Sequence, residues 1–262
     1  TDGADVADAQ LKGSLTARVD QVGQGGGGDQ LLLLGSAQFT PGTRLVTDGQ
    51  FAGSLTQQRS AGGADNSNQA VEIGSVRSGF GGLLATTRGV VDAQLSQTLD
   101  GAGGRQQLFV GSAINRGNGN VDTQGSFTGR LAQQGSVGQH TQRVDIGAAV
   151  GGSGDVQAVG TVDGDITQLR SGAGPAQLKQ FVSVGAVAGA LASALTRASL
   201  DGRVLQSGEA GASDATQTVA IGSVKGSTGL VARTDASFSG TLTQTATRGA
   251  GNQTIAIGSV GQ

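Results

Sequence analysis

Acidic side chains are the first candidates for chemistry in this chain. Asp92, Asp163 and Asp201 stand at equivalent places of a repeating pattern, each one residue before a small residue. A polysaccharide lyase or hydrolase on a β-helix needs clustered carboxylates, or a basic residue, in a groove. Thr128 interrupts the row, which favours solvated surface charges over a catalytic cluster. Asp163 and Asp165 lie two residues apart on one strand face, an arrangement that binds a cation weakly at best.

Metal and nucleotide chemistry has few residues to use. The chain of 262 residues has no Cys and a single His, His140, so no thiolate or imidazole cage for zinc or copper is expected. The run from Gly25 to Asp29 is similar to a calcium-binding β-roll turn but occurs once, and it is interpreted as a flexible arc. No Gly-Lys-Ser/Thr follows Gly35 or its equivalents, which argues against a phosphate loop. We expect no catalytic residue, cofactor or metal, and an exposed loop position for His140.

Composition narrows the class of partners. The net charge is −2 and the pI about 5.3, with Lys and Arg scattered singly, so binding to nucleic acid is not predicted. The longest uncharged apolar stretch, Phe181 to Leu195, is shorter than the roughly 20 residues that span a bilayer. The chain opens at Thr1 with a polar stretch, and we expect that a secretory signal has already been removed. With 49 Gly, 7 Phe and no Trp, Tyr or Met, a conventional bulky core is not expected.

A repeat of about 37 residues runs through the chain. Ile-Gly-Ser-Val at 73–76 returns at 221–224 and 257–260, and a relaxed form gives seven copies. The copies span approximately 5–40, 41–80, 81–117, 118–152, 153–190, 191–227 and 228–262, which we treat as one repeat domain. Their central glycines are Gly35, Gly74, Gly111, Gly147, Gly185, Gly222 and Gly258.

The residues before each central Gly follow a period of two. Val, Ile or Leu stands one and three positions before the Gly, whereas the positions between them vary freely. This alternation predicts a strand with one restricted face. A Gln stands five positions before every central Gly: Gln30, Gln69, Gln106, Gln142, Gln180, Gln217 and Gln253.

A second strand is expected about 20 residues earlier in each copy. It reads apolar, x, small, x, apolar, x, Gln, as in Phe51, Gly53, Leu55 and Gln57. The first copy is predicted to depart from the pattern, with Leu11, Gly13, Leu15 and Ala17. Phe51, Phe127 and Phe238 share one apolar position of this strand. Its Gln residues are Gln57, Gln97, Gln133, Gln168, Gln206 and Gln244.

The fold predicted from this pattern is an all-β solenoid of seven repeats with two strands each. Stacking buries a continuous thin core that no single copy could bury alone. Like strands would lie about 4.8 Å apart, so that equivalent Gln amides can hydrogen-bond along the stack. An antiparallel meander that forms a barrel or sandwich remains an alternative. It would account for the alternation but not for the recurrence of Gln at equivalent places.

We expect the solenoid to polymerise. Soluble solenoids carry polar end caps, whereas here the first copy is under way by Ala9 and the last reaches Val260. Unpaired strand edges at both ends favour head-to-tail contacts between copies of the chain, and such contacts do not close. The function predicted is that of a structural subunit of an extracellular, self-assembling filament, and not of an enzyme.

Short motifs carry a resemblance to known fibre subunits. The segment from Ser239 to Gln244, followed by Gly249 to Gln253, resembles the Ser, Gln, Gly and Asn spacing of curlin-type subunits. The segment from Gly53 to Gln57, followed by Asn66 to Gln69, does the same. In repeat length the chain is similar to secreted amyloid subunits of the Fap kind. The resemblance implies bacterial secretion, assembly at the cell surface and a role in the biofilm matrix, with other matrix components as further partners.

Two other functions remain open from the sequence. The repeat stalk of a surface adhesin would share the solenoid but would need a binding tip or an anchor. A β-helix enzyme acting on polysaccharide is the less favoured alternative, because its carboxylates would have to cluster.

Overall fold

The structure is a computed structural model. It describes residues 8–25, 28–38, 44–60, 67–77, 84–101, 103–114, 119–136, 139–151, 154–171, 177–189, 191–209, 215–226, 230–247 and 251–261. Gly26 and Gly27 of the expected arc lie outside the described residues, as do Asn66 and Gly249 of the segments that carry the curlin resemblance.

Each of the seven copies contributes three strands, and the described residues contain no helix. The long strands are β1 (Asp8–Gln24), β4 (Arg44–Ser60), β7 (Leu84–Asp100), β10 (Val121–Gly135), β13 (Asp155–Arg170), β16 (Ser193–Glu209) and β19 (Val231–Thr247). The second strands are β2 (Gly28–Leu34), β5 (Ser67–Ile73), β8 (Gly103–Val110), β11 (Gln139–Ile146), β14 (Leu178–Val184), β17 (Ala215–Ile221) and β20 (Gly251–Ile257). The short strands are β3 (Ala37–Gln38), β6 (Val76–Arg77), β9 (Ala113–Ile114), β12 (Ala149–Val150), β15 (Val187–Ala188), β18 (Val224–Lys225) and β21 (Val260–Gly261).

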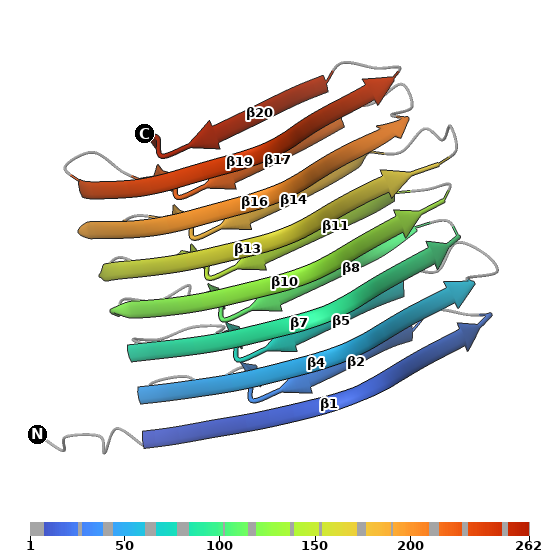
Figure 1. Ribbon diagram of the computed structural model, residues 1–262, viewed down its shortest axis with the longest axis horizontal. Helices are drawn as coiled ribbons and strands as arrows, with labels where there is room; N and C mark the ends of the chain where they lie inside the picture. The colour runs from blue at the N-terminus through green and yellow to red at the C-terminus, as the bar shows by residue number, and fades with distance from the viewer. Residues whose placement is uncertain are drawn as a thin grey trace, which may run out of the picture.

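Like strands stack on like strands in sequence order. The three sheets run β1-β4-β7-β10-β13-β16-β19, β2-β5-β8-β11-β14-β17-β20 and β3-β6-β9-β12-β15-β18-β21, all with parallel pairing. Figure 1 shows the long strands as one layer with the second strands behind them. The predicted β-solenoid is thus confirmed. The antiparallel meander is wrong, because copies of one strand type pair directly with each other.

The structure differs from the prediction in having a third strand per copy. After each second strand the chain turns at the central Gly, whose φ lies between 53° and 59° in all seven copies. This left-handed conformation suits Gly, which lacks a Cβ. The backbone ladder continues around the turn, since the amide of Gly74 donates to Leu34 O and that of Ala37 to Ser75 O. The strand that follows has two residues, too few to show a period in the sequence.

The first copy also differs from the prediction. Leu15 pairs with Phe51 and Gln21 with Gln57, so its pattern is Leu15, Ala17, Val19 and Gln21. The predicted motif, which began at Leu11 and Gly13, was wrong because it lies four residues too early in the chain. The first copy therefore has a Gln at the same position as every other copy. The long strands also begin several residues before the apolar motif from which they were predicted.

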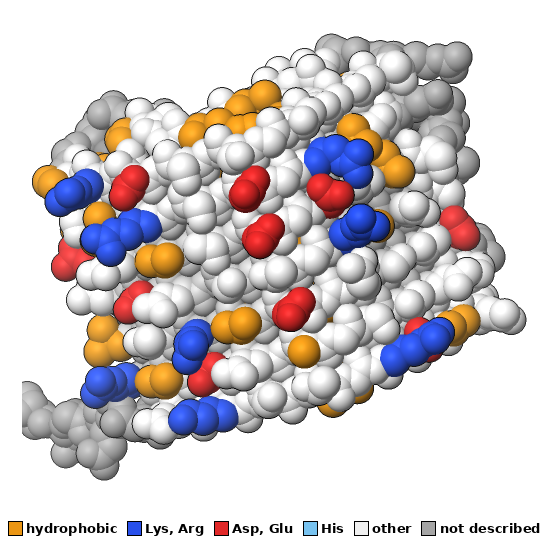
Figure 2. All heavy atoms as spheres, viewed as in Figure 1, with side chains coloured by type: hydrophobic (Ala, Val, Ile, Leu, Met, Phe, Trp, Pro, Cys, Tyr) orange, Lys and Arg blue, Asp and Glu red, His pale blue; other side chains and the backbone are white. Residues whose placement is uncertain are grey.

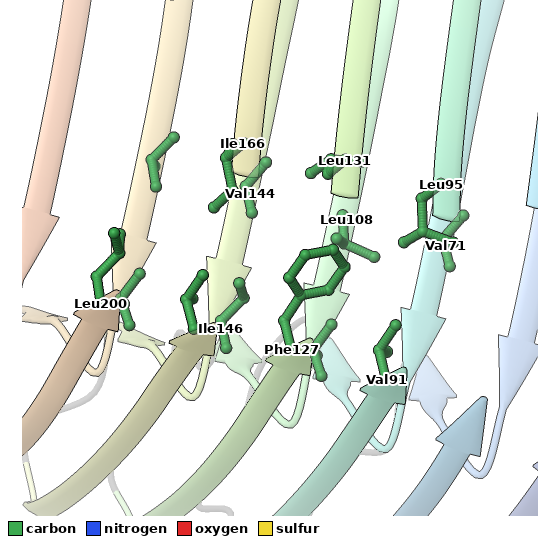
Figure 3. Close-up of a cluster of buried hydrophobic side chains, with 14 of the residues drawn as sticks. Val71, Val91, Leu95, Leu108, Phe127, Leu131, Val144, Ile146, Ile166 and Leu200 are labelled. Carbon is green, nitrogen blue, oxygen red and sulfur yellow. The ribbon is translucent and has the colours of Figure 1, made fainter. Parts of the chain in front are cut away.

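The apolar core is a thin layer between the long strands and the two other sheets. Columns of equivalent side chains face each other across it, for example Leu95, Leu131 and Ile166 of the long strands beside Val71, Leu108 and Val144 of the second strands (Figure 3). Figure 3 shows these columns packed between neighbouring strands. A second cluster, which includes Ala113, Val121, Ala149 and Val156, fills the space between the short strands and the first half of the long strands.

The two sheets approach most closely where the core is built from glycine. A Cβ on Gly49 would meet the backbone of Gly74, and the same holds for Gly89 against Gly111 and Gly125 against Gly147. In the last two copies the long strand has Ala198 and Ala236 at this position. Glycine thus permits both the turn at the central Gly and this close contact between layers.

Candidate functional site

The glutamines form two continuous hydrogen-bonded ladders, and these are the most regular polar feature of the molecule. The long-strand ladder contains Gln21, Gln57, Gln97, Gln133, Gln168, Gln206 and Gln244, with each Nε2 donating to the Oε1 of the preceding copy at 2.7–2.8 Å. The second-strand ladder contains Gln30, Gln69, Gln106, Gln142, Gln180, Gln217 and Gln253, with distances of 2.7–3.0 Å. In the five interior copies all ladder residues are buried.

The two ladders face each other, and each also donates to backbone carbonyls of the opposite sheet. Gln106 Nε2 also donates to Gln97 O at 2.7 Å and to Gln134 O at 3.0 Å. Gln97 Nε2 in turn reaches Gln107 O at 3.2 Å. A buried amide without partners costs about 1–3 kcal/mol, so these contacts are what make a polar column compatible with the core.

The long strands carry a polar column that the sequence analysis did not identify. Thr47, Thr87, Thr123, Thr196 and Thr234 each donate their hydroxyl to the carbonyl oxygen of a central Gly at 2.7–2.9 Å. The bond ties the long strand to the turn of the opposite layer. The recurrence of Thr at the repeat length is visible in the sequence, but its role depends on the geometry of the turn at the central Gly, which the sequence pattern does not show.

The acidic residues weighed as catalytic lie on the outer face of the long strands. Asp92, Asp163 and Asp201 are exposed and occupy one column, in which Thr128 separates the first from the other two. Asp165 instead pairs with Arg203 at 3.3 Å. Figure 2 shows the charged side chains of this face dispersed over it, some of them as neighbours of opposite charge. Among the described residues, no three of His, Asp and Glu come together as a metal-binding group.

The repeat pattern did not predict a charged cluster that lies at the corner between the second and the short strands. Glu72 and Asp145 point away from the main core, yet they are 0% and 1% exposed. Arg77 contacts Glu72 at 2.8 Å and Arg143 contacts Asp145 at 2.6 Å. Both guanidinium groups lie over the ring of Phe109, at 5.0 and 5.7 Å from its centroid. The cluster closes the corner over copies two to four.

The same corner is hollow over copies four to seven. Small side chains line it there, among them Ser183, Ala220 and Ala256, and leave a groove of about 460 Å³. They occupy the column that holds Glu72 and Asp145 in earlier copies. The groove therefore results from side-chain size within one column and not from any change of the backbone.

Two further titratable residues lie on the strands. His140 was predicted to be an exposed loop residue and this is wrong, since it lies in β11 and is 1% exposed. Its ring fits because Gly135 has no side chain, and a Cβ there would come within 3.0 Å of the ring. Half-buried Asp122 has a carboxyl pKa raised above its ordinary value by desolvation.

At the two ends of the solenoid, apolar side chains are exposed at positions that are buried in the interior copies. Ile255 and Ile257 of the last copy are 54% and 40% exposed, whereas their equivalents Val219 and Ile221 are fully buried. Figure 2 shows hydrophobic side chains along the edge where β19 and β20 lie. At the other end Leu15, Val19, Leu32 and Leu34 are only partly buried. Within the described residues, β1 and β19 each pair with one long strand alone.

No family model, curated protein or solved structure matches the chain. No helix in the described part of the chain is long and apolar enough to cross a membrane.

Proposed function

We propose that the chain is the structural subunit of an extracellular, self-assembling fibre of the functional-amyloid kind, which grows head-to-tail through its terminal repeats. The observation that carries the proposal is that, among the described residues, the first and last strands of each sheet have a neighbour on one side only. Each end presents one edge of all three sheets together with a row of core side chains. The partner we propose is another copy of the same chain.

The two ends are complementary because the copies are equivalent. Apolar columns of the last copy end in Phe238, Leu242 and Ile255, and the same columns begin in the first copy with Leu15, Val19 and Leu32. Burying one such side chain fully is worth about 1.5–3 kcal/mol. Each end therefore presents to a second copy the same kind of surface that neighbouring repeats present to each other within one chain.

The extracellular location and the role in a biofilm matrix rest on the resemblance to curlin-type and Fap-type subunits. The regular ladder of strands supports the comparison in one physical respect. Stacked strands with equivalent Gln side chains give a hydrogen-bonded column that can continue without limit along one axis. Asp163 and Asp201 are neighbours in register but lie exposed on the outer face of the long strands, which favours solvated surface charges over the polysaccharide-acting enzyme.

Electron microscopy and fibre diffraction of the purified protein test the proposal. We expect unbranched filaments in concentrated, quiescent solution and a meridional reflection near ~4.8 Å from strands stacked along the axis. Preformed filaments should shorten the lag of a fresh solution. Monomers at every concentration would contradict the proposal and would favour the adhesin stalk. Filaments without the meridional reflection would also contradict it, because the strands would not stack along the axis.

A further inference from the structure

The side-chain amides of both ladders all point the same way. In every one of the twelve ladder bonds the Nε2 faces the preceding copy and the Oε1 faces the following copy, as in Gln133 to Gln97 and Gln142 to Gln106. The direction is fixed by the backbone. Gln142 Nε2 also donates to Gln133 O at 2.8 Å and Leu169 O at 2.9 Å, so a flipped amide would set its oxygen against two carbonyl oxygens.

This direction makes the two ends chemically different. At the first copy, Gln21 Nε2 donates to Leu31 O, and Gln30 Nε2 donates to Gln21 O and Gln58 O. Both groups face a side on which the described residues form no further copy, where an interior ladder residue also meets a glutamine Oε1. At the last copy, the Oε1 groups of Gln244 and Gln253 are left as acceptors, since their Nε2 groups already donate to Gln206 and Gln217. One end therefore offers amide donors and the other offers amide acceptors.

We propose that the joint between two subunits continues both ladders in register, with Gln21 and Gln30 of one copy donating to Gln244 and Gln253 of the next. The inference rests on the proposed function and specifies its interface. Two first copies face to face would set donors against donors, and two last copies would set acceptors against acceptors. Only the head-to-tail joint pairs every amide.

The outer columns support the same register. Lys12 pairs in register with Asp48, and Asp48 with Arg88. The same column ends with Arg197 beside Asp235. Gln124 and Val159 occupy the middle of this column. An in-register joint brings Asp235 of one copy next to Lys12 of the other, a pair of opposite charges like Lys12 beside Asp48. A joint shifted by one residue would instead place the core side chains on the outer face.

Cysteine cross-linking tests the register directly, because the chain has no Cys of its own. Ser14 and Ser237 are exposed and occupy one outer column, through Gln50 and Ser199. In the proposed joint their Cα atoms lie about 4.8 Å apart, within the range for a disulfide. The variant Ser14→Cys/Ser237→Cys, oxidised after assembly, should run as a series of covalent multimers of the 25.6 kDa chain on a non-reducing gel.

The matched control moves one cysteine by two residues on the same face. In Ser14→Cys/Ser239→Cys the Cα atoms would lie about 8 Å apart, too far for a disulfide, and we expect no multimers. Equal or stronger cross-linking of this control would overturn the inference. So would dimers of either single variant, Ser14→Cys or Ser237→Cys, because they would show like ends in contact.

A second variant probes the joint without cysteine. A Cβ on each central Gly except the last meets atoms of the following copy, as Gly147 meets Val159 O and Gly185 meets Arg197 O. In the proposed joint Gly258 would face Lys12 O of the next subunit. Gly258→Ala should therefore fold as a monomer but fail to form filaments, as judged by electron microscopy. Filaments of normal abundance from this variant would overturn the inference while leaving the proposed function intact. Absence of filaments from the unaltered chain would overturn both.

Discussion

At the scale of single residues, a glutamine inside an apolar core is stable only if both ends of its amide are paired. Gln133 meets this condition through its neighbours in the stack, donating to Gln97 and accepting from Gln168. Neither neighbour is close in sequence. The pairing therefore depends on the register of three copies, and a single substitution should reveal it.

We expect Gln133→Leu to lower the stability of the monomer by about 2–4 kcal/mol, because Gln97 loses a donor and Gln168 loses an acceptor inside the core. The control is Gln134→Leu, one residue along, where the side chain is exposed and a change within about 0.5 kcal/mol is expected. Urea unfolding followed by circular dichroism compares the two. Similar unfolding midpoints for both variants would mean that the ladder adds nothing to stability.

The corner cluster allows a second prediction at this scale. Arg77 bonds Glu72, whose side chain is 0% exposed. Arg77→Met would remove the positive partner of the buried Glu72 carboxylate, which would still accept a hydrogen bond from the neutral amide of Gln38. We expect a loss of about 3–5 kcal/mol, the usual cost of removing one partner from a buried ion pair.

Two companion variants decide whether the buried charge is the cause. Arg18 pairs with Asp20 on the surface with 77% of its side chain exposed, so Arg18→Met should cost no more than about 1 kcal/mol. Adding Glu72→Gln to Arg77→Met should recover much of the lost stability, because the neutral amide is less costly to bury than an unpaired carboxylate. No recovery in thermal unfolding of the double variant would assign the loss to packing on Phe109 instead.

At the scale of elements, the turn at the central Gly determines where the second strand ends and the short strand begins. Gly147 has φ of 58°, and a Cβ there would overlap Val159 O of the next copy. Gly258 has nearly the same φ, 56°, but its Cβ would find its nearest neighbour 3.5 Å away. The two positions separate the cost of the backbone conformation from the cost of the contact.

We expect Gly258→Ala to cost the monomer about 1–2 kcal/mol, the price of placing an L-residue in the left-handed region. Gly147→Ala should cost more than about 3 kcal/mol, since the backbone of two copies must also move apart. Chemical unfolding of the two monomeric variants measures the difference. Equal losses of stability in the two variants would show that the contact between Gly147 and Val159 O can adjust without an energetic cost.

The elements also explain how much of the fold the sequence could predict. The inward columns of long and second strands accept a narrow set of residues, so Gln and Val, Ile or Leu recur with period two. The short strands have only two residues and leave no such pattern. In the first copy Leu11, Gly13 and Leu15 imitate the motif four residues early, which hid Gln21 until the register was known.

The polar corner could not be predicted for a different reason. Its column contains Leu33, Glu72, Phe109, Asp145 and Ser183 in successive copies. Such variety is typical of an exposed face. Burial there comes from Gln38 and Arg77 of the short strands and from Phe109 and Arg143 of the second strands. The same holds for His140, whose ring lies against Gly135 of the preceding strand. In both cases the residue type depends on a neighbour that the repeat pattern does not reveal.

At the scale of the whole molecule, each copy contacts mainly the copies before and after it. Stability in such a stack is shared between neighbours, so the first and last copies have half the contacts of the others. Their backbone amides should open more readily than those of the interior, because local opening follows the number of packed contacts. Assembly would remove this difference.

Hydrogen exchange read out by mass spectrometry can follow that change. In the monomer we expect β1 and β20 to exchange fastest and β10 and β11 slowest, because the latter have neighbours on both sides. In filaments the exchange of β1 and β20 should slow by more than about tenfold and approach that of the interior, whereas β10 and β11 should be unchanged. Filaments in which β1 and β20 exchange as fast as in the monomer would contradict end-to-end stacking. The subunits would then be held together through the faces of the sheets and not through their edges.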